Sequence, residues 1–134
     1  DLVKVGLGKM PAKVNWYETD RILLYVVSAP LTLIELENAA EEAWALAAGI
    51  PDMIDIIFDY TGLPEMPRGG MKLVREGSFA LPNIERVALV GEDPLIEMMF
   101  ATMAQETYRP DPSLHKEVGE AASYLRRMAQ EDRT

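Results

Sequence analysis

The chain has 134 residues, of which 49% are hydrophobic and 26% are charged, and its formal net charge at pH 7 is −9. This balance is typical of one soluble globular domain. A chain of about 150 residues buries roughly 70% of its unfolded surface, so it can be stable without disulfides or bound metals. The absence of cysteine excludes disulfides, zinc–thiolate sites and a cysteine nucleophile.

Charge and hydropathy argue against two further classes of partner. The longest basic run is Arg126-Arg127, which is too short for the basic stripe that nucleic-acid binding requires. The longest uncharged stretch, 22–34, contains Pro30 and is shorter than the ~20 residues that span a bilayer. The amino-terminal residues also lack a secretory pattern. We therefore expect a cytoplasmic protein with no nucleic-acid partner and no membrane span.

The first elements predict an antiparallel hairpin. Residues 1–13 carry three lysines, two glycines and Pro11, and we interpret them as an arm ahead of the domain. Residues 14–17 and 22–27 are rich in β-branched and aromatic side chains, and a polar turn separates them. Two such runs joined by a short polar segment favour paired strands.

A long helix is the next predicted element. Thr32 and Glu35 have the spacing of a capping box, and Gly49 is a typical residue for the end of a helix. Between them, apolar side chains recur at helical spacing, which predicts a helix over 33–48. Its expected buried stripe is Leu33, Leu36, Ala40, Ala43, Trp44 and Ala47.

The rest of the chain alternates strands with helices. Strands are expected over 53–58 and 86–90, because both are nearly continuous apolar runs. The other predicted elements are helices over 70–78, 94–108 and 116–130 and a short edge strand within 111–115. This order predicts a single α/β domain over 14–130. We expect one mixed, mostly parallel sheet of four to five strands, with about four helices packed against it.

Three strings between residues 56 and 125 carry a family resemblance. They are IIFDYTG at 56–62, RVALVG at 86–91 and EAASYL at 120–125. In this order and spacing they resemble the STAS superfamily (sulphate transporter and anti-sigma-factor antagonist), in particular its SpoIIAA-like branch. The resemblance covers about residues 14–128. It implies the same α/β fold and a non-enzymatic function in binding.

The sequence departs from this family at the regulatory serine. Phospho-regulated members carry that serine at the start of the helix after the central strand. The corresponding residues here are Arg68, Gly69 and Gly70, none of which has a hydroxyl group. We therefore expect no phosphorylation at this position.

Two candidate polar sites follow from the predicted elements. Asp59 and Thr61 come at the end of a central parallel strand, where ligands of open α/β sheets bind. Alternatively, these side chains satisfy only the local turn. Arg68, Gly69 and Gly70 precede a helix, so the guanidinium and backbone amides could bind a carboxylate or phosphate. The alternative there is a flexible loop.

An apolar pocket between sheet and helices is a further candidate. Methionine-rich helices suit ligand pockets, partner grooves and ordinary packed cores alike. We expect the helix over 94–108 to bury Leu95, Ile96, Met99 and Met103, and to leave Met98 exposed. The residues that would line the pocket are Phe79, Leu81, Met99, Phe100 and Met103.

The sequence gives little support for catalysis. His115 is the only histidine, and no second group for metal or acid–base chemistry has a defined spacing from it. The serines lack the nucleophile-elbow motif. The glutamates of the helix over 33–48 fit a solvated helix face. We therefore expect no metal and no cofactor.

The resulting functional hypothesis is a non-enzymatic STAS-like domain that acts through protein–protein contacts. It would bind a partner protein, or a second copy as a homodimer, through residues 59–70 and the helix that follows. The alternative is a carrier or sensor of a small apolar or amphipathic, lipid-like molecule. An enzyme that uses Asp59 or His115 is the third and least favoured hypothesis.

Overall fold

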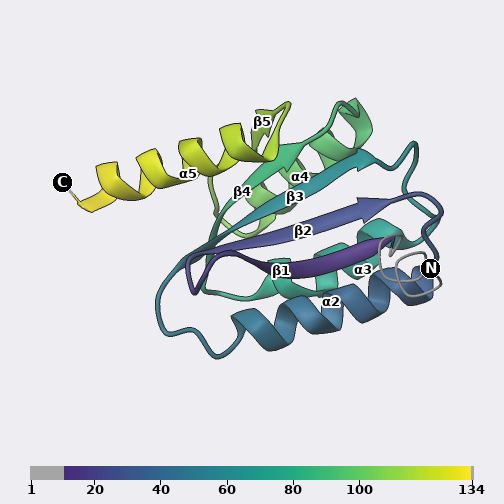
Figure 1. Ribbon diagram of the computed structural model, residues 1–134, viewed down its shortest axis with the longest axis horizontal. Helices are drawn as coiled ribbons and strands as arrows, with labels where there is room; N and C mark the ends of the chain where they lie inside the picture. Colours follow the sequence, from purple (N-terminus) through teal and green to yellow (C-terminus); the bar gives the residue numbers. More distant parts are fainter. Residues whose placement is uncertain (1–10, 134) are drawn as a thin grey trace, which may run out of the picture.

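The computed structural model describes residues 11–133, and its elements carry the labels of Figure 1. In chain order they are β1 Ala12–Glu18, β2 Ile22–Ser28, α2 Leu33–Ala47, β3 Ile54–Gly62, α3 Gly70–Glu76, the short 3-10 helix η1 Ser78–Ala80, β4 Ile84–Val90, α4 Pro94–Glu106, β5 Ser113–His115 and α5 Val118–Arg133. Ala12 and Lys13, which we assigned to the arm, belong to β1. The rest of the arm, apart from Pro11, lies outside the described residues.

The strands form a five-stranded sheet in the order β1-β2-β3-β4-β5. β1 is antiparallel to β2, and each later pair of neighbours is parallel. The order and directions confirm the predicted α/β architecture with an antiparallel hairpin at its start. All the carboxyl ends of the parallel strands therefore lie at one edge of the sheet, which we call the carboxyl edge (Figure 1).

The hairpin turn depends on a residue that tolerates a left-handed conformation. Asp20 has φ of 62°. The amide of Arg21 donates a hydrogen bond to the carbonyl oxygen of Glu18 at 3.0 Å and closes the turn. Asp enters the left-handed region more readily than most residues, because its short polar side chain can bond locally.

The capping box is confirmed at the start of α2. The Thr32 hydroxyl oxygen accepts a hydrogen bond from the Glu35 amide at 3.2 Å, and the Thr32 amide donates to Glu35 Oε1 at 2.9 Å. The backbone amides of Thr32 and Glu35 at the start of the helix therefore both have hydrogen-bond acceptors.

The buried stripe of α2 is narrower than predicted. Ala39, Ala43 and Ala47 are buried against the sheet, whereas Leu33 and Trp44 are 42% and 45% exposed. Alanines at this spacing let the helix approach the sheet closely, so the bulkier side chains at the margins of the stripe remain in solvent. The prediction that Leu33 and Trp44 are core residues is wrong.

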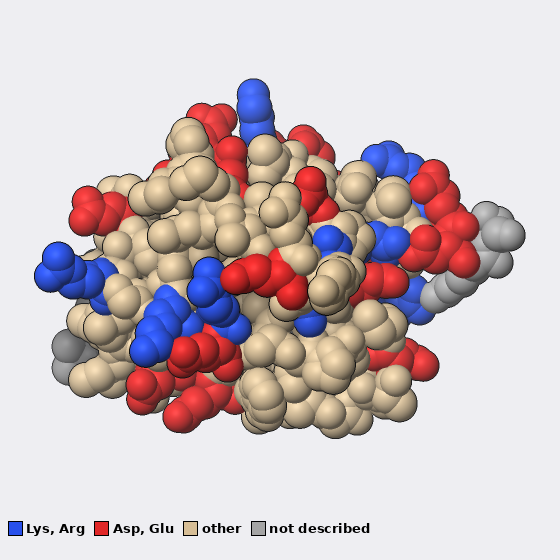
Figure 2. All heavy atoms as spheres, turned by 180° about the vertical axis from the view of Figure 1, so that it is seen from behind, with Lys and Arg blue, Asp and Glu red and all other residues tan. Residues whose placement is uncertain are grey.

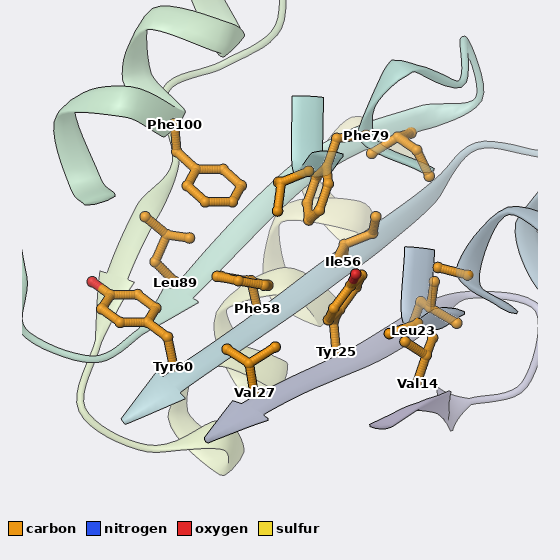
Figure 3. Packing of buried hydrophobic residues seen from close by; sticks show 14 of the residues in the cluster. Val14, Leu23, Tyr25, Val27, Ile56, Phe58, Tyr60, Phe79, Leu89 and Phe100 are labelled. Atoms are coloured by element: carbon orange, nitrogen blue, oxygen red, sulfur yellow. The ribbon is translucent and has the colours of Figure 1, made fainter. Parts of the chain in front are cut away.

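The larger core lies between the sheet and helices α2, α3 and α4, and aromatic rings fill its centre (Figure 3). Phe58 contacts Phe100 and Tyr25 with ring centroids 5.2 and 5.3 Å apart. Phe79 packs edge-on against Phe100 at 5.2 Å. Such edge-on and tilted contacts suit the ring quadrupoles.

The opposite face of the sheet is covered by α5 alone, and its core is built of smaller side chains. The buried residues there are Ile22, Ile57, Ala88, Val90, Ala121, Ala122 and Leu125. The last turn of α5 also reaches the sheet through an ion pair between Asp132 and Arg86. No helix between residues 11 and 133 is long and apolar enough to cross a membrane.

Candidate functional site

The central strand β3 is longer than predicted. It continues to Gly62, because Gly62 is paired with Ser28 of β2. Asp59 is paired with both Val26 of β2 and Val90 of β4. Asp59 and Thr61 therefore lie within the strand. The alternation of side chains along β3 places them on the same face as Ile57, which packs under α5.

Asp59 and Thr61 satisfy one another. Asp59 Oδ1 accepts hydrogen bonds from the Thr61 amide at 3.0 Å and from the Thr61 hydroxyl. This is the local alternative that we considered for the pair. The carboxylate of Asp59 is thus engaged within its own strand.

The loop before α3 adopts a tight conformation that depends on glycine. Gly69 has φ of 83°, a region that L side chains rarely adopt. A Cβ on Gly70 would lie 2.7 Å from Met66 Sδ, so no larger residue fits there without a shift. The Gly70 amide already donates to the Pro67 carbonyl at 2.8 Å. The predicted anion cradle therefore lacks the amide of Gly70.

Arg68 and Gly69 instead form one side of an open groove, and α4 forms the other side. This carboxyl-edge groove has a volume of about 320 Å³. Its lining includes Met66, Arg68, Gly69, Met71, Leu95 and Met99. Leu95, which we expected to be buried, is 56% exposed, because it lies in the first turn of α4 at the mouth of the groove. Met98 is exposed as predicted.

The five residues of the predicted apolar pocket do not share a cavity. Phe79, Leu81, Phe100 and Met103 are buried in the larger core. The gap beside Phe79, Phe100 and Met103 measures about 20 Å³, which is room for about one water molecule. Only Met99 reaches an open cavity, and that cavity is the carboxyl-edge groove. The hydrophobic pattern correctly identified the other four side chains as buried, but the side chains themselves fill the space in which a pocket was expected.

A second hollow of about 490 Å³ lies at the same edge, lined by Tyr60, Thr61, Gly91, Asp93 and Lys116 among others. The Tyr60 hydroxyl is buried and has no hydrogen-bond partner among the described residues. Burial raises the pKa of Tyr60, so the hydroxyl stays protonated. Gly91 has φ of 150°, and a Cβ there would lie 2.5 Å from the Tyr60 ring. This glycine is therefore required for the ring to pack at the strand end.

His115 is held by structural contacts. Its Nε2 lies 2.8 Å from Ser113 Oγ and its Nδ1 lies 3.2 Å from Glu120 Oε1. The ring also packs against Tyr124 with centroids 5.2 Å apart. Across residues 11–133, no three histidine or carboxylate side chains come together as a potential metal site.

A charged cavity at the opposite edge of the sheet was not predicted from the sequence. This cavity, of about 260 Å³, is lined by Asp55, Arg126 and Asp132 among others. Asp55 is only 7% exposed, and its Oδ1 accepts a hydrogen bond from the Arg86 amide at 3.1 Å. Burial raises the pKa of Asp55 to about 6, although the nearby Arg86 lowers it. The sequence feature that could have indicated this cavity is Asp55, a single carboxylate inside the apolar run 53–58.

Comparison with solved structures identifies the fold. The structure is similar to an uncharacterized protein of the DUF3478 family with a SpoIIAA-like fold from Shewanella loihica PV-4, with a TM-score of 0.63. The two sequences are 19% identical, and the similarity covers 85% of this chain and 91% of that chain. No protein-family model matches the chain, and no curated protein matches it. The chain therefore has a SpoIIAA-like fold, which confirms the fold that the three strings implied.

Proposed function

We propose that this chain is a non-enzymatic binding domain that contacts a partner protein through the carboxyl-edge groove. The observation that carries the proposal is the composition of that groove. Its lining is mostly apolar, and the charged residues in it are Glu65, Asp93 and Arg68. Arg68 is exposed and has no ion pair among the described residues. The groove includes residues 65–69 of the surface that the family resemblance suggested, and it adds the start of α4, which that expectation did not include.

Burial of apolar surface would provide the driving force for binding. Leu95 and Met98 are 56% and 60% exposed on the first two turns of α4. Covering them would gain about 25 cal/mol per Å² of apolar surface removed from water. The methionines of the groove can adjust their rotamers to a partner, and Arg68 can pair with a carboxylate on it.

The hydrogen bonds of Asp59 and His115 support a role in binding rather than catalysis. Asp59 bonds to Thr61, and both ring nitrogens of His115 have partners. Neither group lines the carboxyl-edge groove. Neither of these two groups is therefore placed to act on a molecule held in the groove.

A second candidate function uses the same groove for a small amphipathic molecule. Arg68 and Met99 line it together, so an acidic head group and an apolar chain could both find contacts. A volume of about 320 Å³ is at the lower end of the ~300–1,000 Å³ that small-molecule sites occupy. The groove therefore suits only a short or partly exposed ligand.

Site-specific photo-crosslinking in the native cell tests the proposal. A photoreactive residue at Leu95 should capture one discrete partner protein, whereas the same residue at Leu114 should capture none. Leu114 is the matched control because it is 54% exposed and lies on β5, outside the groove. The absence of any species specific to position 95 would overturn the proposal. A crosslinked dimer would identify the partner as a second copy.

Native mass spectrometry separates the two candidate functions. If the groove holds a small molecule, the purified protein should carry an additional mass that disappears in Leu95→Asp and Arg68→Ala. The Leu114→Asp variant should keep this mass. Such a result would favour the carrier function over the partner-binding function.

A further inference from the structure

The charged side chains of α2 are all acidic. Between Arg21 and Arg68 the chain has eight acidic residues and no basic residue. Four of the eight lie on α2, and one of these, Glu35, caps the helix start. The other three form no ion pair with any described residue. The outer surface of α2 therefore carries negative charge that the fold itself does not neutralise.

A hollow of about 340 Å³ separates α2 from α3, and we call it the α2–α3 groove. Its floor is made of the smallest side chains, because the two helices come close at Ala40 and Gly77. A Cβ on Gly77 would lie 3.2 Å from the Ala40 Cβ. Trp44 and Leu73 line the groove above this floor, and the Trp44 side chain is 45% exposed.

The rim of the α2–α3 groove is acidic. Its carboxylates come from both helices and are Glu37, Glu41 and Glu76. The exposed cations of α3 are outside the groove lining, and one of them, Arg75, pairs with Glu106 at 3.5 Å. Figure 2 shows acidic groups gathered at the lower edge of the rear face, with the nearest basic groups above them.

We propose that the α2–α3 groove binds a basic amphipathic segment of a partner protein. One large apolar side chain of the segment would fill the hollow beside Trp44 and Leu73. Lysine or arginine residues on the same segment would face the three glutamates of the rim. A cation near the Trp44 ring would gain an additional attraction to its π face.

Charge complementarity selects this occupant over others. A nucleic acid would be repelled by the rim, because both carry negative charge. A metal ion would need three convergent ligands, and the described residues bring no such group together. The inference is independent of the proposed function, because the α2–α3 groove and the carboxyl-edge groove share no lining residue.

Trp44 provides a direct spectroscopic readout of binding. The other tryptophan, Trp16, is replaced by Phe so that emission reports on Trp44 alone. The probe is a synthetic peptide of leucine and lysine with ~14 residues, about four turns of amphipathic helix. The control probe has glutamate at every lysine position. The lysine peptide should shift and change the Trp44 emission, and the glutamate peptide should leave it unchanged.

Two neighbouring charge reversals separate groove binding from general attraction to an acidic protein. Glu41→Lys and Glu42→Lys change the net charge equally on the same helix, but only Glu41 lines the groove. We expect Glu41→Lys to weaken the lysine peptide by about tenfold or more, and Glu42→Lys to weaken it by less than ~threefold. Circular dichroism checks the fold of each variant, and Glu41→Gln provides a milder second test with the same direction.

Three results would overturn the inference. Equal losses in Glu41→Lys and Glu42→Lys would show that only net charge attracts the peptide. An unchanged Trp44 emission on binding would place the peptide elsewhere. A Trp44 emission that changes with protein concentration alone would make a second copy of the chain the occupant.

Discussion

The two faces of the sheet are covered in different ways. On one face, α2, α3 and α4 enclose a cluster of aromatic rings, and the gap beside Phe79 and Phe100 holds about one water molecule. On the other face, α5 alone covers small side chains such as Ala121 and Ala122, and a charged cavity opens beside it. Dense packing and open polar space are thus separated by the sheet.

This difference separates the densely packed part of the molecule from the parts that have open surface hollows. The gap beside Phe79 and Phe100 is too small for a ligand, and the carboxyl-edge groove and the α2–α3 groove both lie at the margins of this face. The α5 face has fewer buried apolar groups and retains the ionisable Asp55. Four measurements compare the two faces, in order of decreasing expected effect.

The largest effect is expected on the aromatic face. Phe58→Ala removes a ring that contacts Tyr25, Tyr60, Phe79 and Phe100, and it leaves a cavity among rigid neighbours. The free energy of unfolding should fall by about 3–5 kcal/mol, as measured by urea denaturation. A loss of less than ~2 kcal/mol would mean that the surrounding rings collapse into the space, and the contrast between the faces would weaken.

Asp55 should make the α5 face sensitive to pH. Its pKa of about 6 in the folded protein exceeds its ordinary value of 3.8, so ionisation disfavours the folded state. The destabilisation grows as the pH rises from about 4 to 6, is complete above the folded pKa, and corresponds to ~3 kcal/mol.

Asp55→Asn removes this titration while keeping an acceptor for the Arg86 amide. Relative to the unmodified protein, the variant should gain about 2–3 kcal/mol in free energy of unfolding between pH 3.5 and pH 8. Urea denaturation of both proteins across this range measures the difference. A difference that does not vary with pH would show that Asp55 ionises at its ordinary pKa.

Leu125→Ala tests how firmly α5 is attached. Leu125 is fully buried between α5 and the sheet, and the variant should lose about 2–3 kcal/mol, toward the low end for a buried leucine. We expect the low end because α5 can settle toward the sheet over its small neighbours. Hydrogen exchange should accelerate in α5 and stay slow in β2 and β3. Equal acceleration in all three elements would show that both faces unfold as one unit.

The smallest effect is expected for the surface ion pair of α5. Arg126 Nε lies 3.0 Å from Glu18 Oε1, and the two side chains are 49% and 34% exposed. Arg126→Ala should therefore cost less than ~1 kcal/mol, and high salt should reduce this cost further. Arg127→Ala is the matched control, because Arg127 contacts the Tyr124 ring but has no ion pair among the described residues. A cost above ~2 kcal/mol would make this pair a principal anchor of α5.

Local signals explain why the elements were predictable. The Thr32–Glu35 capping box, the apolar run of β3 and the Asp93-Pro94 start of α4 each act within a few residues, and each appears in the structure. Their order along the chain was sufficient to predict the mixed sheet, because short connections restrict strand and helix placement.

Burial at the margins of the helices was not predictable in the same way. Leu33, Trp44 and Leu95 have the correct spacing for core residues, yet each is exposed. Whether such a side chain is covered depends on how far the neighbouring elements extend, and periodicity contains no information on that distance.

The candidate site was predicted only in part, for a related reason. Asp59 and Arg68 both lie at the carboxyl edge, as expected, but Asp59 faces α5 and Arg68 lies on the groove beside α4. Side chains alternate between the two faces of a strand, and Asp59 is two residues from Ile57, which packs under α5. The predicted pocket failed because total side-chain volume, rather than pattern, decides whether a cavity stays open.

The order of the strands in the sheet has a consequence for synthesis on the ribosome. Each strand lies beside the next strand along the chain, so the sheet can grow at one edge as residues emerge. Phe58 of β3 is then in place before its neighbours Phe79 and Phe100 have been translated. The aromatic cluster closes only when α4 is complete, and the α5 face closes last. Nascent chains that end after β3 would therefore leave the Phe58 ring without its contacts to Phe79 and Phe100.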